Sequence, residues 1–505
     1  MLPWVMLMRS RLLPDWVPIA PWRWWIHMRM VFLPMSYIWS KRFTYPLNDL
    51  TRSLRAELHT APYNTISFAS HRNTIHPNDN YHPKTFLLNS INWFLVLIWI
   101  PILRPLFSLP PLNLTARAEA YTWNMIAAED KASDFANLGP VNSPMNTLAA
   151  YIHSGPSSPA FLRHLPRLHD FLWMGRQGML VNGTNGVQTW DTALLVQSLA
   201  EAAPSIAADP RWRPMLSRAH AFLEAQQIRE EPENREAVYR QTRKGAWAFS
   251  NRVQGYTVSD CTSEGLIAVL HLQSIPGFPT LVDAQRQRDA IDVLLTMQNA
   301  NGGFSSYEPR RGNASLMEML NAAEVFGRIM VEYDYPECTT AVILALHTFK
   351  KAQPGYRYRH IDAAIAAALD YIRVAQRPDG SWYGSWGICF TYAAFFALSA
   401  LARAGGETCA NSERVRRACA FLVSKQAADG GWGESYRACE IGEWVDHPEG
   451  SQVVMTAWAC IALMEAEYPE LEAVVGRGIK LIVGRQQGNG EWLQEGIEGV
   501  FNKSW

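Results

Sequence analysis

The sequence lacks an excess of charge of either sign and lacks any cysteine framework. Its 505 residues contain 46 Lys and Arg against 46 Asp and Glu, so the formal net charge is zero. A neutral chain has no basic field to attract nucleic acid, and no nucleic-acid partner is expected. The odd, scattered cysteines show no CxxC spacing, which indicates reduced thiols facing the cytosol, without zinc or disulfides. They are Cys261, Cys338, Cys389, Cys409, Cys419, Cys439 and Cys460.

The sequence also has little that resembles a targeting or membrane-spanning segment. Arginines interrupt its short apolar start and no small-residue cleavage site follows, so no signal peptide is expected. The strongest apolar run, Trp93 to Leu103 (WFLVLIWIPIL), is 11 residues long, whereas a span needs about 20. Three prolines are expected to break it: Pro101, Pro105 and Pro110. The run fits either a buried core helix or a segment dipping into one leaflet, anchored by Trp93, Trp99 and Arg104.

Aromatic residues and one repeated phrase are abundant. The chain has 20 Trp, 20 Phe and 18 Tyr, enough to line a large apolar cavity as well as a core. Four phrases place a glutamine six positions before an aromatic residue, and the copies lie 50 to 78 residues apart. Such repeats indicate one supersecondary unit stacked on its neighbours. The copies are Gln298-NANGG-Phe304, Gln376-RPDGS-Trp382, Gln426-AADGG-Trp432 and Gln486-QGNGE-Trp492.

Two kinds of helical segment alternate around these phrases. Amphipathic segments such as DAAIAAALDYIRVAQ lead into a phrase, and more uniformly apolar ones such as TYAAFFALSALARAG follow it. Amphipathic helices outside and apolar helices inside predict an α/α toroid. The glycine-rich phrases are expected to stop helices, with the glutamine amides bonding backbone groups at helix ends. Their aromatics, Trp382, Trp432 and Trp492, are interpreted as structural.

One acidic segment, Val258-Ser-Asp260-Cys261-Thr-Ser-Glu264, opens an apolar helix. Spacing alone favours Asp260 as an ordinary N-cap. Acid catalysis would instead require a buried carboxyl that stays protonated and still releases its proton, with donors on the forming carboxylate. Cys261 adjoins the aspartate, and Cys338 begins another apolar helix, although buried structural cysteine explains either thiol equally well.

These motifs together resemble the oxidosqualene cyclases, which belong with the squalene–hopene cyclases. The resemblance rests on the DCTSE segment, the four phrases and the string PWRWWIHMRMVFLPM, and it runs from about Leu13 to Ser504. The sequences of these motifs are most similar to those of the fungal lanosterol synthase group. It implies an all-α fold of two α/α barrels, the first incomplete: a partial N-terminal domain over 1–170, with membrane contact near 86–111, and a C-terminal toroid over 176–505. The boundary itself is expected near Gly175 to Gly186.

The resemblance also implies a reaction. Such an enzyme protonates the epoxide of (3S)-2,3-oxidosqualene and runs a cationic ring-forming cascade to a lanosterol- or protostane-type triterpene, without cofactor or metal. It would lie monotopically on the cytosolic face of the endoplasmic reticulum or on a lipid droplet. By motif, Asp260 matches the catalytic acid and Cys261 and Cys338 the thiols that hydrogen-bond it. His27 matches a histidine near the end of the cascade, and Tyr307 matches its tyrosine partner.

Several aromatic positions carry over as well. Ring faces stabilise a cation by roughly 0.5 to 2 kcal/mol each without attacking it as a nucleophile. Without the family match, core packing would explain any one of them. They are Trp190, Phe249, Phe326, Trp386 and Phe501.

The sequence departs from the family pattern at one internal position and at both ends. Ser263 replaces the usual alanine of DCTAE, which adds a hydroxyl near the acid. The family carries a longer N-terminal segment and a tyrosine-rich tail where this chain ends in Trp505. Because both would wall a cavity that excludes water, the isolated chain is expected to be a poor enzyme or a non-catalytic remnant.

Two other toroid functions remain as alternatives. A glycosidase needs two carboxylates across a cleft, about 5 to 10 Å apart, whereas Asp260 and Glu264 lie four residues apart on one helix. A protein prenyltransferase β-subunit needs zinc ligands. The nearest histidine cluster lies in a proline- and asparagine-rich loop outside the toroid: His71, His76 and His82.

Overall fold

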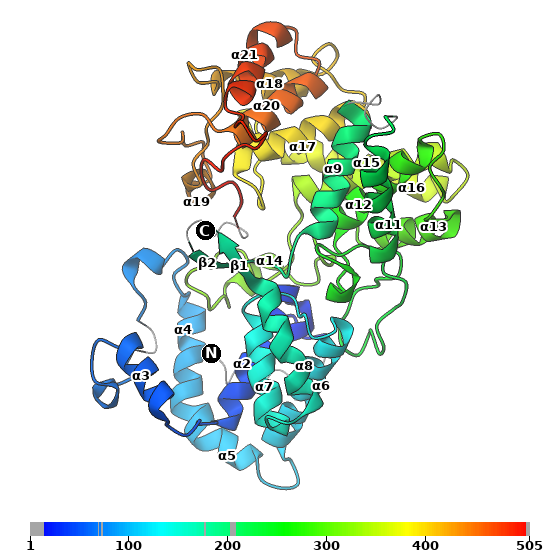
Figure 1. Ribbon diagram of the computed structural model, residues 1–505. Coiled ribbons are helices and arrows are strands. Elements are labelled where there is room, and N and C mark those ends of the chain that lie inside the picture. The colour runs from blue at the N-terminus through cyan, green and yellow to red at the C-terminus, as the bar shows by residue number, and fades with distance from the viewer. Residues whose placement is uncertain (1–14, 69, 72–73, 176–177, 203–208, 501–505) are drawn as a thin grey trace.

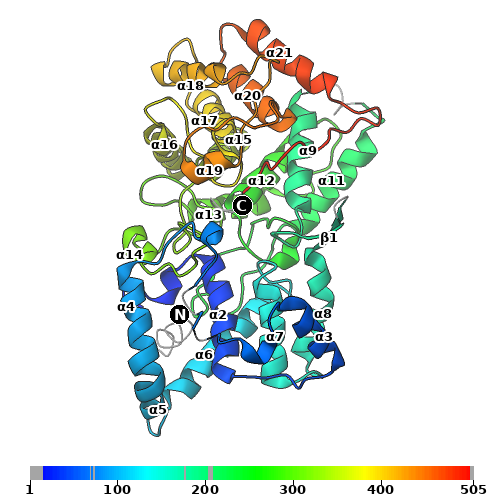
Figure 2. The same ribbon diagram turned by 90° about the vertical axis from the view of Figure 1, so that its left-hand side faces the viewer.

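The chain forms two helical regions that lie one above the other in Figures 1 and 2. The computed structural model describes residues 15–68, 70–71, 74–175, 178–202 and 209–500. Residues up to about 170 build the lower region, and the repeats build the upper one. The prediction of an all-α fold is confirmed, with one exception. A short hairpin joins β1 (Leu172–Gly175) to β2 (Gly178–Val181), and the sequence analysis did not predict it.

The lower region is organised around α2 (Ile26–Lys41), which packs on α6 (Leu114–Ala132) and α7 (Asn142–Ser154). Most of α2 is buried, including the charged side chain of Arg29. The remaining helices of this region are α3 (Asp49–Leu58), α4 (Phe86–Phe94), α5 (Arg104–Phe107) and α8 (Pro159–Arg167). Its single turns are η1 (Pro21–Arg23), η2 (Tyr63–Thr65), η3 (Pro77–Asp79) and η5 (Leu168–Phe171).

The apolar run of the lower region is a longer helix than its sequence suggests. Helix α4 continues through a π-helical stretch, η4 (Leu95–Leu103), into α5 without interruption. The expectation that prolines break it is wrong for Pro101 and Pro105. Bonds that reach five residues back, such as Arg104 N–H to the Trp99 carbonyl, let the chain continue past a residue without an N–H. The resulting 22-residue helix, Phe86–Phe107, is long and apolar enough to cross a membrane, and 17% of its most apolar window is buried.

The upper region is built from alternating inner and outer helices, as predicted. The inner helices pack on one another in chain order. They are α9 (Gln188–Ala202), α12 (Ser259–Ser274), α15 (Pro336–Ala352), α17 (Cys389–Arg403) and α20 (Val453–Glu465). The outer helices are α11 (Arg213–Gln226), α13 (Ala284–Leu295), α16 (Tyr358–Ala375), α18 (Glu413–Ser424) and α21 (Leu471–Gly484). Short helices complete it: η6 (Arg252–Gln254), α14 (Ala314–Glu318) and α19 (Arg437–Ile441).

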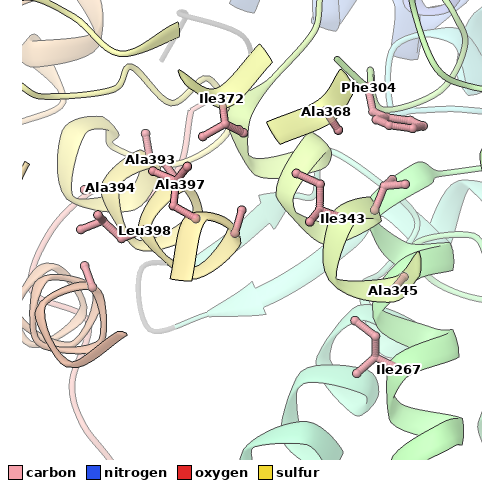
Figure 3. Packing of buried hydrophobic residues seen from close by; sticks show 14 of the residues in the cluster. Ile267, Phe304, Ile343, Ala345, Ala368, Ile372, Ala393, Ala394, Ala397 and Leu398 are labelled. Carbon is pink, nitrogen blue, oxygen red and sulfur yellow. The ribbon is translucent and has the colours of Figure 1, made fainter. Parts of the chain in front are cut away.

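The core of the upper region lies between these two layers. Figure 3 shows part of it, with Ala393, Ala397 and Leu398 of α17 turned into the same interior as Ile343 of α15 and Ile372 of α16. Alanine is frequent on α17, and its small side chains let neighbouring helices approach closely. This packing explains why the inner segments are more uniformly apolar than the outer ones.

The first three repeated phrases hydrogen-bond their turn to the next outer helix. The Gln376 amide donates to the carbonyls of Gly380, 3.0 Å away, and of Arg414 near the start of α18, also 3.0 Å away. The Trp382 indole N–H donates to the Ile372 carbonyl at 2.8 Å. Gly380 has φ of 91°, a conformation that favours glycine. The predicted turn and structural roles are confirmed, but the second acceptor belongs to the following helix.

A fifth unit with the same glutamine and tryptophan contacts was not predicted from the sequence. The Gln227 amide donates to the carbonyls of Gly245 and of Arg286 in α13, each at 2.9 Å. The Trp247 indole donates to the Leu223 carbonyl at 2.8 Å. The contacts repeat those of Gln376 and Trp382, but here the glutamine and tryptophan lie twenty positions apart instead of six. The long insertion between them hides the motif.

Candidate active site

The candidate acid lies in the first turn of α12, in a buried position. The Asp260 side chain is 8% exposed. Its Oδ1 accepts a hydrogen bond from the Cys261 backbone N–H at 2.7 Å, and its Oδ2 accepts one from the Cys338 thiol at 3.5 Å. The N-cap interpretation is wrong, because the N-cap is Val258 and the Asp260 carboxyl bonds the very next N–H. The Cys261 thiol also hydrogen-bonds this carboxyl, so both thiols predicted to flank the acid lie within its reach.

A loop from the first repeat connects the starts of α12 and α15 through hydrogen bonds. The Ser259 N–H donates to the Ser306 carbonyl at 2.8 Å, and the Phe304 N–H donates to the Thr339 hydroxyl at 2.9 Å. The Ser306 hydroxyl also lies 3.3 Å from the Cys338 sulfur. This loop fixes the separation between the two helix ends, and with it the distance between the thiol and the carboxyl.

Burial and hydrogen bonding act on the acid in opposite directions. Burial raises the pKa of Asp260, and this effect outweighs the hydrogen bonds from the Cys261 N–H and the two thiols, which lower it. Burial also raises the pKa of Cys261 and Cys338 well above the usual value, so both thiols keep their protons and remain donors. The result is a carboxyl held towards its protonated form, with donors ready for the carboxylate that forms when the proton leaves.

Ser263, which stands where the family usually has alanine, does not disturb this arrangement. The Ser263 hydroxyl donates to the Ser259 carbonyl one turn back at 2.7 Å, within α12, and its side chain is fully buried. The added hydroxyl is thus satisfied by the helix itself. Glu264, one position further on, bonds the Gln197 amide at 2.6 Å, on the side of α9.

Three more buried carboxyls lie near the candidate site, and none of them was a predicted site residue. Burial raises the pKa of Glu264 to about 7 and that of Glu337 to about 7, with the charge of Asp260 adding to both shifts. Burial raises the pKa of Glu332 well above its usual value, with Glu308 adding to the effect. Glu337 also accepts hydrogen bonds from the N–H groups of Ser385 and Trp386, at 2.8 and 3.1 Å.

The predicted histidine and tyrosine meet, although 280 positions separate them in the sequence. The rings of His27 and Tyr307 lie edge to face, with centroids 4.9 Å apart. Trp25 covers His27 from another side at 4.2 Å. Burial, with a contribution from nearby Arg29, lowers the pKa of His27 to about 3, so its imidazole is neutral at neutral pH.

The aromatic candidates gather around a second hydrophobic cluster, separate from the toroid core. This cluster contains Cys261, Cys338 and Tyr307. Against it pack four partly buried rings, Trp190, Phe249, Phe326 and Trp386. Trp190 stacks on Phe249 with centroids 5.5 Å apart. Phe501, the fifth aromatic candidate, lies outside the described residues.

The structural tryptophans have different surroundings. Trp382 and Trp432 are fully buried in the toroid core and bond a backbone carbonyl through the indole N–H. Trp492 makes the same bond to Ile482 at 2.7 Å but is 43% exposed. The four described candidate aromatics, by contrast, are only partly buried and pack against the cluster that contains Cys261, Cys338 and Tyr307.

The alternative functions find little support in this geometry. Asp260 and Glu264 share one helix, and Glu264 turns to Gln197 on α9. In the described part of the chain, no three His, Cys, Asp or Glu side chains are grouped as metal ligands. His71 and His76 each make local contacts only one to three residues away in the sequence, to Thr74 and Asn78.

Comparison with known proteins identifies the family of the chain. Residues 187–503 match the squalene-hopene cyclase C-terminal domain. Lanosterol synthase erg7A of Aspergillus fumigatus is 58% identical over 98% of this chain, and lanosterol synthase ERG7 of Gibberella zeae is 56% identical over 98%. The human lanosterol synthase is 41% identical over 98%. The chain spans 64%, 63% and 66% of the lengths of these relatives.

The alternating inner and outer helices define the class of α/α-toroid proteins. The chain belongs to the terpene cyclase/mutase family that includes these lanosterol synthases.

Proposed function

We propose that the protein is a triterpene cyclase that converts (3S)-2,3-oxidosqualene into a lanosterol- or protostane-type tetracycle. The observation that carries this proposal is the Asp260 carboxyl, buried between the first turns of α12 and α15, with the Cys338 thiol 3.5 Å from Oδ2. The names of the relatives, lanosterol synthases at 56–58% identity, support the same substrate class. No cofactor or metal is needed for this reaction.

In the proposed first step, Asp260 transfers its proton to the epoxide oxygen. The C–O bond at the more substituted carbon breaks as the neighbouring π bond attacks that carbon, so the oxygen becomes a hydroxyl. Hydrogen bonds from Cys338 and from the Cys261 N–H strengthen as the carboxylate forms, which makes the proton easier to release. The burial that raises the pKa of Asp260 keeps the proton available beforehand.

The positive charge then moves through successive ring closures. The partly buried faces of Trp190, Phe249, Phe326 and Trp386 are suited to stabilise it, because a ring face attracts a cation without bonding to it. The last step releases a proton from carbon and leaves a double bond. His27, neutral and in contact with Tyr307, is suited to accept this proton, since even a weakened imidazole is a far stronger base than an alkene. Protons balance, so the reaction is an isomerisation.

A water-insoluble substrate suggests a membrane location, and we extend the proposal to monotopic contact with a lipid surface. The helix Phe86–Phe107 supports it by its length, apolarity and exposure, with Phe86 88% and Trp93 62% exposed. The proposed location is the cytosolic face of the endoplasmic reticulum or a lipid droplet. Flotation with phospholipid vesicles tests this part: Trp93→Glu is expected to leave the protein in the dense fraction, with Trp212→Glu as the exposed-tryptophan control.

Expression in a yeast strain that lacks its own cyclase, fed oxidosqualene, tests the enzymatic proposal. Triterpenes are read by mass spectrometry beside an Asp260→Asn control. A cyclised product that disappears in the control supports both the reaction and the acid. Unchanged oxidosqualene in the presence of folded protein would instead indicate the non-catalytic remnant.

A further inference from the structure

A buried ion pair lies directly behind the contact between His27 and Tyr307. Arg29 follows His27 by two positions, and Glu308 follows Tyr307 by one. The two charged groups form a fork: Arg29 Nη2 lies 2.5 Å from Glu308 Oε1, and Nη1 lies 3.1 Å from Oε2. Their side chains are 0% and 2% exposed.

Further bonds tie this pair to both chain segments. Arg29 Nη1 donates to the Trp24 carbonyl at 2.6 Å, which fixes the guanidinium to the start of α2. Arg311 adds a second cation 3.3 Å from Glu308 Oε2, and the Arg23 guanidinium donates to the Arg311 carbonyl at 2.9 Å. The pair is therefore the centre of a junction between the start of α2 and the loop that carries Tyr307.

The two hydrogen bonds between Arg29 and Glu308 restrict how the two chain segments can be placed relative to each other. A guanidinium that makes two parallel bonds to a carboxylate fixes orientation as well as distance. Apolar side chains could fill the same volume, and replacing a buried ion pair with them is often neutral or stabilising. A pair of this kind is therefore suited to specify one relative placement of two segments more than to add stability.

We propose that Arg29 and Glu308 are positioning residues that hold His27 against Tyr307 and so determine where the cascade ends. They touch neither the acid nor, in the proposed reaction, the substrate. If the imidazole shifts relative to the last cation, the proton is lost from a different carbon and other triterpenes form. This inference rests on the proposed cyclase activity for its effect on products, but its structural part can be tested without turnover.

The experiment compares single variants with a double one. Arg29→Met and Glu308→Gln each leave one buried group without its partner, and both are expected to lower the Tm and the amount of product. The double variant Arg29→Met/Glu308→Gln removes both charges together. The proposal expects its Tm to recover at least halfway towards that of the unmodified protein, while the ratio of other triterpenes to the main product stays at least ~10-fold raised.

A matched control separates positioning from stability. Arg286→Met/Glu224→Gln removes an ion pair between α13 and α11, 2.7 Å long and distant in the fold from His27. It is expected to leave the product ratio unchanged. A double variant of Arg29 and Glu308 with a normal product ratio would overturn the proposal, as would an equal change of ratio in the control.

A second measurement does not depend on the reaction. In protein labelled with ¹³C at histidine, the His27 signal is assigned by its loss in His27→Gln, and the nearby Tyr307 ring shifts it. The proposal expects Tyr307→Leu and the double variant to move this signal in the same direction, and the control not to move it. An unmoved signal in the double variant overturns the positioning role, whereas absence of any triterpene from the unmodified chain overturns only the enzymatic proposal.

Discussion

The toroid core and the site cluster use the same residue types in opposite ways. In the core, Trp382 and Trp432 are fully buried, and each indole N–H bonds a carbonyl of the preceding helix. In the site cluster, Trp190 and Trp386 are only partly buried and pack at its edge. The two classes therefore differ in the cluster against which the ring packs: the toroid core for the structural rings, and the cluster that contains Cys261 and Cys338 for the site rings. The following substitutions test this distinction.

The largest effect is expected at the acid. Asp260→Asn preserves the shape of the side chain but removes the proton that opens the epoxide. Loss of a general acid typically lowers a rate by about 10²- to 10⁴-fold. Triterpene formation should fall by this factor or become undetectable, while circular dichroism and Tm stay near those of the unmodified protein. Substantial turnover by Asp260→Asn would place the acid elsewhere.

Trp432→Ala tests the structural class. Removing a fully buried ring leaves a cavity and costs about 3 to 5 kcal/mol of stability. It also leaves the Leu422 carbonyl without the indole donor that lies 2.8 Å away. Denaturant unfolding should show the loss, and the product ratio of whatever protein remains folded should be unchanged. A changed product ratio without loss of stability would put Trp432 in the other class.

The pH dependence of stability tests the buried carboxyls around the site. Glu337 titrates near 4.5 when unfolded and near 7 in the folded protein. Between these values the folded state holds more protons, so stability should fall as the pH rises through this window and level off above it. In Glu337→Gln this contribution, on the order of 3 kcal/mol, disappears. Urea titrations at pH 5 and pH 8 measure it; an identical pH slope in both proteins would contradict the assigned pKa.

The smallest effect is expected at a site aromatic. Trp386→Leu keeps an apolar side chain but removes the ring face, whose attraction for a cation is about 0.5 to 2 kcal/mol. Turnover should drop by between about 2- and 30-fold with little change in Tm. Trp492→Leu is a suitable control, because Trp492 is a partly exposed tryptophan of the repeats. If both substitutions act alike on turnover, packing against the site cluster does not distinguish the two classes.

The toroid could be predicted from the sequence because its signal is local. A glutamine, a glycine turn and an aromatic recur at one spacing, and in the first three copies the glutamine amide bonds a carbonyl of the next outer helix. The copy around Gln227 and Trp247 was missed because an insertion changes the spacing and leaves the contacts intact. The long apolar helix was misjudged because Pro101 was treated as a break, although π-helical bonding bypasses it.

The site could be predicted only in part. Family motifs located Asp260, the thiols and the aromatics, and no local pattern would have done so. The sequence offered no signal for the Arg29–Glu308 pair, whose partners lie 279 positions apart. Buried Glu337 was also missed, because an acidic residue at the start of a helix is usually a solvated, dipole-stabilised side chain. Long-range burial, which a single sequence does not display, determines both.

The hydrogen-bond donors around Asp260 also give the acid a direction. A carboxyl group has about four lone-pair positions, and a proton can occupy only one that no donor already fills. The Cys261 N–H takes one on Oδ1, and the Cys338 thiol takes one on Oδ2. The acidic hydrogen is thereby restricted to the lone-pair positions that the backbone N–H and the thiols leave free. The donors that fill lone pairs of the Asp260 carboxyl therefore affect two properties of the acid. They affect how readily it releases its hydrogen, and they affect which substrate atom that hydrogen can reach.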